Sequence, residues 1–122
     1  MMQLFHDSGY KCSESVTRLY STSFSSAIGL LHRDLRKPIY GIYGFVRVAD
    51  EIVDTFHEFD KAALLAEFSA DTWKAIERGI STNPILHAFQ QVVHQYDIPR
   101  ELITAFLRSM EMDLDKTVYH NT

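Results

Sequence analysis

Residues 39–56 read IYGIYGFVRVADEIVDTF and carry two side-chain stripes at the spacing of a helix. Because a helix turns by about 100° per residue, seven apolar side chains fall within an arc of roughly 120°. This apolar stripe consists of Ile42, Phe45, Val46, Ala49, Ile52, Val53 and Phe56. We therefore expect one long helix from near Asp34, its candidate N-cap, to about Phe56. Pro38 fits such a helix only because it lies near the start.

The second stripe is polar and lies on a different side of the same helix. It consists of Arg36, Tyr40, Tyr43, Arg47, Asp50 and Asp54. Asp50 and Asp54 project together, about 6 Å apart along the helix axis, with Arg47 roughly one turn before them. These residues pose the functional question, because they form either a solvated face or a site.

Two further features of the same segment favour a buried helix over a solvated one. Gly41 and Gly44 lie inside the helix, where each costs about 1 kcal/mol relative to alanine. Such a cost is usually offset by close packing against a neighbour, or by room for a ligand. Tyr40, Tyr43 and Phe45 also place aromatic rings on nearly all sides of the helix. We expect a central helix, buried all round, whose polar stripe faces an internal cavity.

The rest of the chain predicts further helices and no strand. The candidate helical segments are residues 8–23, 23–35, 60–79, 83–96 and 98–119. Asp60 and Gly79 are the expected cap and stop of one helix, and Asn83 followed by Pro84 begins the next. No run alternates apolar and polar residues, and the turns lack a hairpin signal. The prediction is an all-α fold in a single domain spanning residues 1–122.

Composition limits the class of protein. A chain of 122 residues suits one domain, and a net charge of −4 argues against general nucleic-acid binding. The single cysteine, Cys12, cannot form an internal disulfide, which fits a reducing, cytoplasmic setting. The N-terminus lacks the pattern of a signal peptide, and the longest apolar run, residues 39–46, is too short to span a bilayer. Any membrane association would therefore be peripheral.

The aspartate pair has a chemical interpretation and two rivals. Buried carboxylates are costly unless they are paired or bind metal, and oxygen ligands with an open side suit Mg²⁺. Their spacing alone is a weak signal, because it occurs on many solvated helix faces and is more typical of those than of a site. A di-iron site built on Asp54-x-x-His57 requires a second acidic-x-x-His element, and only Gln91-x-x-His94 comes close. His94 and His87 share one helix face and are interpreted as structural histidines.

Several motifs in order extend beyond the aspartates. They are Ser21, Ser23 and Phe24 as Ser-x-Ser-Phe, then Arg36, then Tyr43-x-x-x-Arg47, then the acidic motif from Asp50 to Asp54, and finally Met112-Asp113-Leu114. In this order they resemble the N-terminal part of the squalene/phytoene synthase family, on the phytoene-synthase side. The resemblance implies a head-to-head prenyl transferase with the all-α isoprenoid synthase fold and a central cavity.

The resemblance also implies roles for individual residues. Asp50 and Asp54 would be the catalytic pair that binds Mg²⁺ and, through it, a prenyl diphosphate, with Glu51 as a lesser metal ligand. The implied substrate-binding residues are Tyr20, Ser21, Ser23, Phe24, Arg36, Tyr43, Arg47 and Asp113. The chain departs from the family pattern at three places: Tyr20 stands where histidine is frequent, Leu31-His32 where Leu-Pro is frequent, and Glu51 where aspartate is common.

The favoured function is Mg²⁺-dependent condensation of two geranylgeranyl diphosphates into phytoene. The alternatives are a squalene or dehydrosqualene synthase that uses farnesyl diphosphate, and a non-catalytic helical interaction module. A lipid substrate and product would allow peripheral membrane association, and nothing in the sequence specifies an oligomeric state. The family pairs its acidic motif with a second one, which no segment after Asp54 repeats, since Asp113 and Asp115 point roughly 200° apart. We therefore expect the 122-residue chain to be inactive alone.

Overall fold

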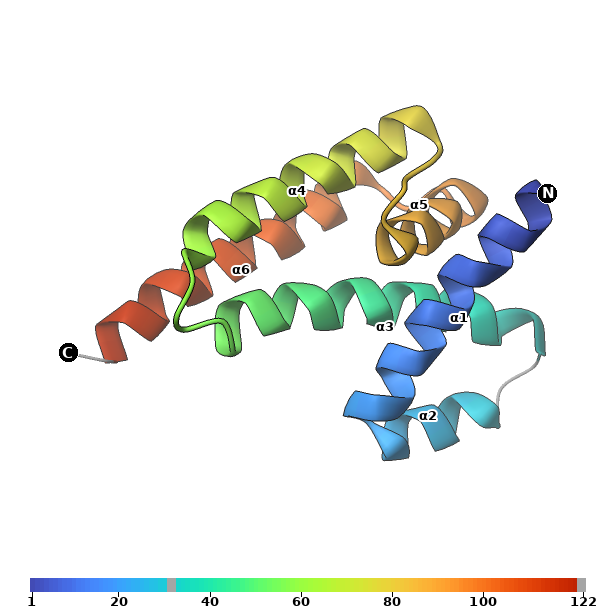
Figure 1. Ribbon diagram of the computed structural model, residues 1–122, viewed down its shortest axis with the longest axis horizontal. Coiled ribbons are helices and arrows are strands. Elements are labelled where there is room, and N and C mark those ends of the chain that lie inside the picture. The colour runs from blue at the N-terminus through green and yellow to red at the C-terminus, as the bar shows by residue number, and fades with distance from the viewer. Residues whose placement is uncertain (31–32, 121–122) are drawn as a thin grey trace.

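The computed structural model describes residues 1–30 and 33–120, and this part of the chain consists of six helices without a strand (Figure 1). The helices are α1 (Met2–Tyr20), α2 (Thr22–Gly29), α3 (Arg33–Asp54), α4 (Lys61–Arg78), α5 (Pro84–Tyr96) and α6 (Arg100–His120). The predicted all-α fold is confirmed. The departure at Leu31-His32 lies outside the described residues, and so do the side chains of Ser23 and Phe24.

The helix ends that the sequence predicted are formed by the expected chemistry. Asp60 caps α4 by accepting a hydrogen bond of 3.1 Å from the backbone N–H of Ala63, and Gly79 ends it with a left-handed φ of 70°. The Asn83 side chain accepts bonds from two backbone N–H groups at the start of α5, with Pro84 as the first helical residue. Local sequence therefore sets the boundaries of both helices.

Helix α1 begins at Met2, six residues before the start that the sequence predicted. The added turns are held by contacts with α5, which is distant in sequence. The Phe5 ring lies 4.4 Å, centroid to centroid, from the ring of His87, and His6 stacks on that ring at 5.1 Å. The break at the serines is confirmed, because Ser21 adopts an extended conformation between α1 and α2.

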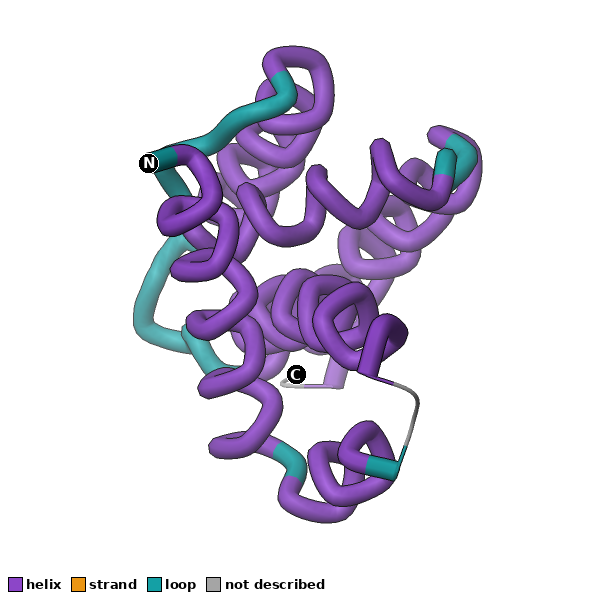
Figure 2. The backbone as a smooth tube through the Cα atoms, turned by 90° about the vertical axis from the view of Figure 1, so that its right-hand side faces the viewer, coloured by secondary structure: helices purple, strands orange, loops and turns teal. Residues whose placement is uncertain are grey.

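Helix α3 is the centre of the bundle, as predicted, since it contacts all five other helices. Figure 2 looks roughly along α3 and shows the other helices around it. The two glycines of α3 serve close packing. A methyl group on Gly44 would lie 2.8 Å from the Ser13 hydroxyl of α1, and one on Gly41 would lie 3.0 Å from Val92 of α5.

The apolar stripe of α3 forms the core, with one exception. The Phe45 ring stacks on Phe89 at 3.8 Å and lies 5.4 Å from Phe68 and 5.5 Å from Phe106, so four helices meet at one aromatic cluster. Ile42 was predicted to belong to this core, but it is 37% exposed. Helices α4 and α6 diverge from α3 toward its N-terminal half (Figure 1). Ile42, in that half, is not part of the core cluster.

A buried histidine pair joins α1 to α5. His87 is 0% exposed, and its Nδ1 accepts a hydrogen bond of 3.3 Å from the Ser81 backbone N–H. The proton of the neutral ring is therefore on Nε2, which donates to Nδ1 of His6 at 2.8 Å. Burial, followed by the neighbouring His6, lowers the pKa of His87 below its usual value. Both histidines are structural here, as the sequence analysis expected for His87.

This arrangement predicts a loss of stability in acid. Because the folded state lowers the pKa of His87, the unfolded chain binds more protons as the pH falls below about 6.5. The free energy of unfolding should then fall by up to about 1.4 kcal/mol per pH unit, while being flat above pH 7. Urea unfolding between pH 5 and pH 7.5 measures this slope. His87→Gln should flatten it, whereas His57→Gln, at an exposed histidine, should leave it unchanged; an equal slope in all three proteins would refute the assignment.

None of the helices, over the residues that the structure describes, combines the length and apolar character needed to cross a membrane.

Candidate functional site

The part of the polar stripe from Arg47 to Asp54 occupies the C-terminal half of α3, where Arg47 contacts Tyr20 at the end of α1 and Asp50 lies near Asp113 of α6. The side chains of Arg47 and Asp50 are 23% and 32% exposed, and Asp54 is exposed. The sequence predicted that this stripe faces an internal cavity. In the described residues its far end faces solvent, because α3 ends at Asp54 and the chain turns away to α4.

Arg47 is the centre of the charge network. Its Nη2 donates a hydrogen bond of 2.6 Å to Oε1 of Glu51, and its Nη1 lies 3.8 Å from Oδ2 of Asp50. Helix geometry produces both contacts, since side chains three and four residues apart are neighbours on one face. The Nε–H of Arg47 is buried without an acceptor among the described residues. Arg47 thus keeps an unused donor beside two carboxylates.

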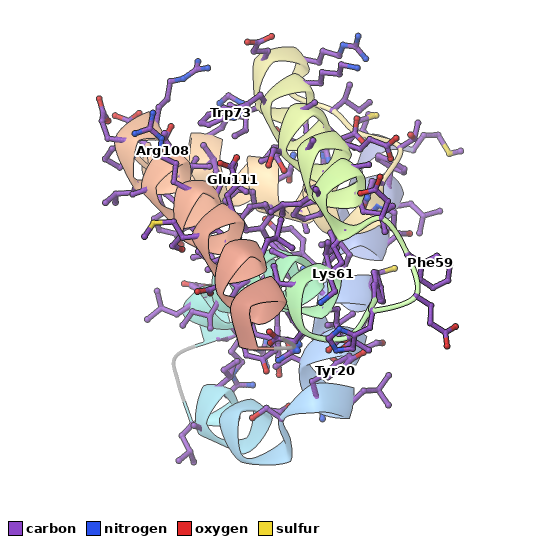
Figure 3. The ribbon with its side chains drawn as sticks, turned by 90° about the vertical axis from the view of Figure 1, so that its left-hand side faces the viewer. Tyr20, Phe59, Lys61, Trp73, Arg108 and Glu111 are labelled. Carbon is purple, nitrogen blue, oxygen red and sulfur yellow. The ribbon has the colours of Figure 1, made fainter. Side chains whose placement is uncertain are left out.

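Helix α1 contributes Tyr20 to this network. The Arg47 guanidinium carbon lies 4.9 Å from the centroid of the Tyr20 ring, which is a cation–π distance. Tyr20 and Thr55 also lie close enough to the Glu51 carboxylate to lower its pKa. Figure 3 shows Tyr20 at the end of the molecule where α3 stops and α4 starts. The structure thus places Tyr20 with Arg47, even though the chain lacks the family's frequent histidine there.

The pKa directions show how firmly Arg47 and Glu51 are paired. Burial opposes the charge of Glu51, but hydrogen bonds from Thr55, Arg47 and Tyr20 outweigh it and lower the pKa of this carboxyl. Burial likewise opposes the charge of Arg47, and the hydrogen bond and charge of Glu51 outweigh it, so its pKa is raised. Glu51 therefore acts in this structure as the ionic partner of Arg47.

Asp50 is in the opposite situation. Burial raises the pKa of its carboxyl; Arg47 partly opposes this, while repulsion from Asp54, Asp113 and Glu51 adds to it. Asp113 belongs to α6, so the facing helix brings a further carboxylate toward α3. This corner of the molecule carries more negative charge than Arg47 neutralises, and a cation would relieve the excess.

The donor set fits a metal that takes few protein ligands. No three His, Cys, Asp or Glu side chains converge on a metal position in the described part of the chain. A metal that demands a complete protein cage is therefore not supported there. Mg²⁺ is bound by one or two carboxylates together with water and substrate phosphates. Asp50 and Asp54, with the first partly buried and the second exposed, match that requirement.

The other predicted site residues are distributed unevenly. Tyr43 lies close enough to Arg47 to influence its charge, and Ser21 is the corner residue between α1 and α2. Arg36 is different, because fourteen residues of helix place it about 21 Å from Asp50 along the axis. Its Nη2 donates to the backbone carbonyl of Gly29 at 2.8 Å. Arg36 is thus separated from the aspartate pair.

Two residues at this corner had not been identified from the sequence. The Thr55 backbone N–H donates to the Glu51 carbonyl at 2.9 Å, and Thr55 also lowers the pKa of the Glu51 carboxyl. The ammonium of Lys61, labelled in Figure 3, donates to the carbonyl of Val53 in the last turn of α3. The position of Thr55, directly after the acidic motif, was the available signal. The approach of Lys61 depends on the path of the α3–α4 loop, which no local pattern encodes.

Comparison with known proteins gives a consistent result. The squalene/phytoene synthase profile matches residues 17–122. The chain is 36% identical over 111 residues to a phytoene synthase of Rhodobacter capsulatus, covering 89% of this chain and 32% of that protein. It is 28% identical over 97 residues to a presqualene diphosphate synthase of Rhodopseudomonas palustris, covering 80% and 34%. No solved structure gives a significant match.

The profile match runs from the end of α1 through α6 and includes the acidic stripe of α3, which is formed by Asp50, Glu51 and Asp54. The chain belongs to the squalene/phytoene synthase family, whose enzymes carry out head-to-head prenyl transfer. It spans about a third of the length of the curated relatives that it matches.

Proposed function

We propose that this chain forms the diphosphate-ionising half of a head-to-head prenyl transferase, with geranylgeranyl diphosphate as the substrate and phytoene as the product. The observation that carries the proposal is the pairing of a held cation with an excess of carboxylate. Arg47 is fixed by Glu51, while the pKa of Asp50 is raised by burial and by repulsion from Asp54 and Asp113. A Mg²⁺–diphosphate complex is complementary to both, because the metal matches the carboxylates and the phosphate oxygens match Arg47.

Different residues of the chain would bind the metal, bind the diphosphate and position the arginine. Asp50 and Asp54 would hold Mg²⁺, which when bound neutralises the leaving diphosphate. Arg47 would donate to diphosphate oxygens, and its buried Nε–H would gain the acceptor that it lacks. Tyr20 and Glu51 keep the guanidinium in place, which limits the reorganisation needed as charge develops on the leaving group.

The metal role proposed for Glu51 is the weakest of the three. Its carboxylate already accepts a hydrogen bond of 2.6 Å from Arg47, and Thr55, Arg47 and Tyr20 together lower its pKa. We therefore assign Glu51 to positioning Arg47, and propose Asp50 and Asp54 as the metal ligands. Ser21, at the corner between α1 and α2, and Tyr43, close to Arg47, are the substrate contacts that this assignment includes.

The test is titration calorimetry of a non-hydrolysable geranylgeranyl diphosphate analogue, with Mg²⁺ and again with EDTA. The proposal expects binding that weakens by about a hundredfold when Mg²⁺ is removed, because the carboxylates then repel the diphosphate. The farnesyl analogue tests the alternative substrate, and tighter binding of it would favour a squalene-type or dehydrosqualene-type reaction. Absence of Mg²⁺-dependent binding of either analogue would favour a non-catalytic helical module.

A further inference from the structure

A basic cavity lies at the opposite end of α3 from the acidic stripe. It has a volume of about 470 Å³ and is enclosed by α1, α2 and the first turns of α3. Its four cationic lining side chains are Arg18, Arg33, Arg36 and Lys37. This volume falls in the range of about 300–1,000 Å³ that is typical of small-molecule sites.

The ion pairs of these cations are few and exposed. Among the described lining residues the one carboxylate is that of Glu14, which lies 3.2 Å from Arg18. Lys37 lies 3.4 Å from Asp7, but both side chains are well exposed, and such pairs contribute little. Arg33 has no ion-pair partner among the described residues. Among the described lining residues, cations outnumber carboxylates, and Arg33 is the cation on which the excess depends most.

The position of these cations on α3 adds to the electrostatic repulsion between them. Arg33, Arg36 and Lys37 occupy the first five residues of a 22-residue helix. The N-terminus of a helix carries a partial positive charge, so cations there are unfavourable and anions are favourable. A bound anion would reverse the sign of this interaction. The same turn also presents backbone N–H groups that lack intrahelical acceptors.

Two buried hydroxyls on the cavity wall indicate a ligand independently of the charges. Tyr40 is 5% exposed and Ser25 is 8% exposed, and both line the cavity. Neither hydroxyl forms a hydrogen bond within the part of the chain that the structure describes. Both hydroxyls are therefore free to donate to an acceptor in the cavity.

We propose that this cavity binds a phosphate-class anion without a metal, at a site separate from the acidic stripe. Cations, a helix N-terminus and hydroxyl donors are the groups that recognise phosphate oxygens. Its separation from Asp50, about 21 Å along α3, prevents one diphosphate from reaching both sites. The phosphate could belong to free diphosphate or to an anionic lipid headgroup, and both present the same oxygens.

The experiment is titration of sodium diphosphate into the protein in EDTA, so that no metal site contributes. We expect Arg33→Gln/Lys37→Gln to weaken binding by about tenfold or more, and Tyr40→Phe by roughly three- to tenfold. Lys74→Gln/Arg108→Gln is the matched control, since it removes two exposed cations elsewhere and should leave binding unchanged. Asp50→Asn/Asp54→Asn should also leave it unchanged, which separates this result from the proposed metal–diphosphate function.

A second arm identifies the source of the phosphate. Sedimentation with phosphatidylcholine vesicles, with and without phosphatidic acid, is carried out on the same proteins. Binding to phosphatidic acid that needs Arg33 and Lys37, without binding of free diphosphate, would support the proposal with a lipid headgroup as the ligand. Equal weakening by the control pair, or no binding in either arm, would overturn it. Circular dichroism of each variant establishes that it is folded.

Discussion

Asp50→Asn and Asp54→Asn are each expected to lower Mg²⁺-dependent affinity for a prenyl diphosphate analogue by about a hundredfold. Each change removes one of the two carboxylates that would hold the metal, while the remaining one still repels the phosphate. In an enzyme that joins this chain to the second acidic motif implied by its family, turnover should fall by orders of magnitude. Glu51→Gln is the matched comparison, because it also removes one negative charge from the stripe.

Glu51→Gln should retain the Mg²⁺ dependence and weaken binding by a smaller factor, since it loosens Arg47 and leaves both metal ligands in place. Equal losses in Asp50→Asn, Asp54→Asn and Glu51→Gln would mean that Glu51 is a metal ligand as well. Unchanged affinity in both aspartate variants would show that the stripe is not the diphosphate site.

The unfolding free energy of Asp50→Asn is an independent test of the electrostatic repulsion at this position. The fold raises the pKa of Asp50, so the contribution of this group to stability grows as the pH falls through that pKa. At neutral pH the ionised carboxylate therefore destabilises the folded chain. Asp50→Asn should raise the metal-free unfolding free energy by a few tenths of a kcal/mol, on the order of a surface charge interaction. A large loss of stability would indicate a structural role instead.

Gly44→Ala is expected to lower the free energy of unfolding by about 1–2 kcal/mol, although alanine is the better helix former. The new methyl group would lie 3.0 Å from Cβ and 3.2 Å from Cα of Ser13, as well as 2.8 Å from its hydroxyl. Ser13 is 0% exposed, so its side chain cannot swing into solvent. The cost of separating α1 from α3 therefore exceeds the gain in helix propensity. Thermal unfolding should show a midpoint lowered by roughly 4–8 °C per kcal/mol.

Gly29→Ala is the matched control for this change. No atom lies within 4 Å of the methyl group that it would add, so the protein should be unaffected or stabilised by up to about 1 kcal/mol. Ser13→Gly combined with Gly44→Ala moves the extra volume from one helix to the other and should recover part of the loss. If Gly44→Ala is as stable as Gly29→Ala, the packing explanation is wrong.

The parts of the fold that could be predicted from sequence are those set by short-range chemistry. Asp60 and Asn83 accept bonds from backbone groups within three residues, and the two stripes of α3 follow from helix geometry alone. The early start of α1 could not be predicted in this way. It depends on the contact between His6 and His87, which are 81 residues apart in the chain. The exposure of Ile42 likewise depends on the packing of other helices around α3.

In the candidate site, too, contacts within one helix could be predicted from the sequence, and contacts between helices could not. The alignment of Arg47 with Asp50 is a property of one helix and was predictable. The strong pairing of Arg47 with Glu51 was not, because it is completed by Tyr20 from another helix. Helical spacing also placed Arg36 on the same face of α3 as the aspartates. Sharing a face does not bring two residues into one site when they are about 21 Å apart along the helix. The structure describes Arg36 as part of a different cavity.

The contact between Tyr20 and Arg47 makes the corner of α1 and α2 sensitive to what the acidic stripe holds. Tyr20 is the last residue of α1, directly before the extended Ser21. An anion that accepts from the unused Nε–H of Arg47 binds a guanidinium that the Tyr20 ring and Glu51 already contact. By thermodynamic linkage, if anion binding tightens the contact between Tyr20 and Arg47, a well-seated Tyr20 strengthens anion binding by the same free energy. The affinity of the acidic stripe for an anion and the position of the corner at Ser21 are therefore coupled.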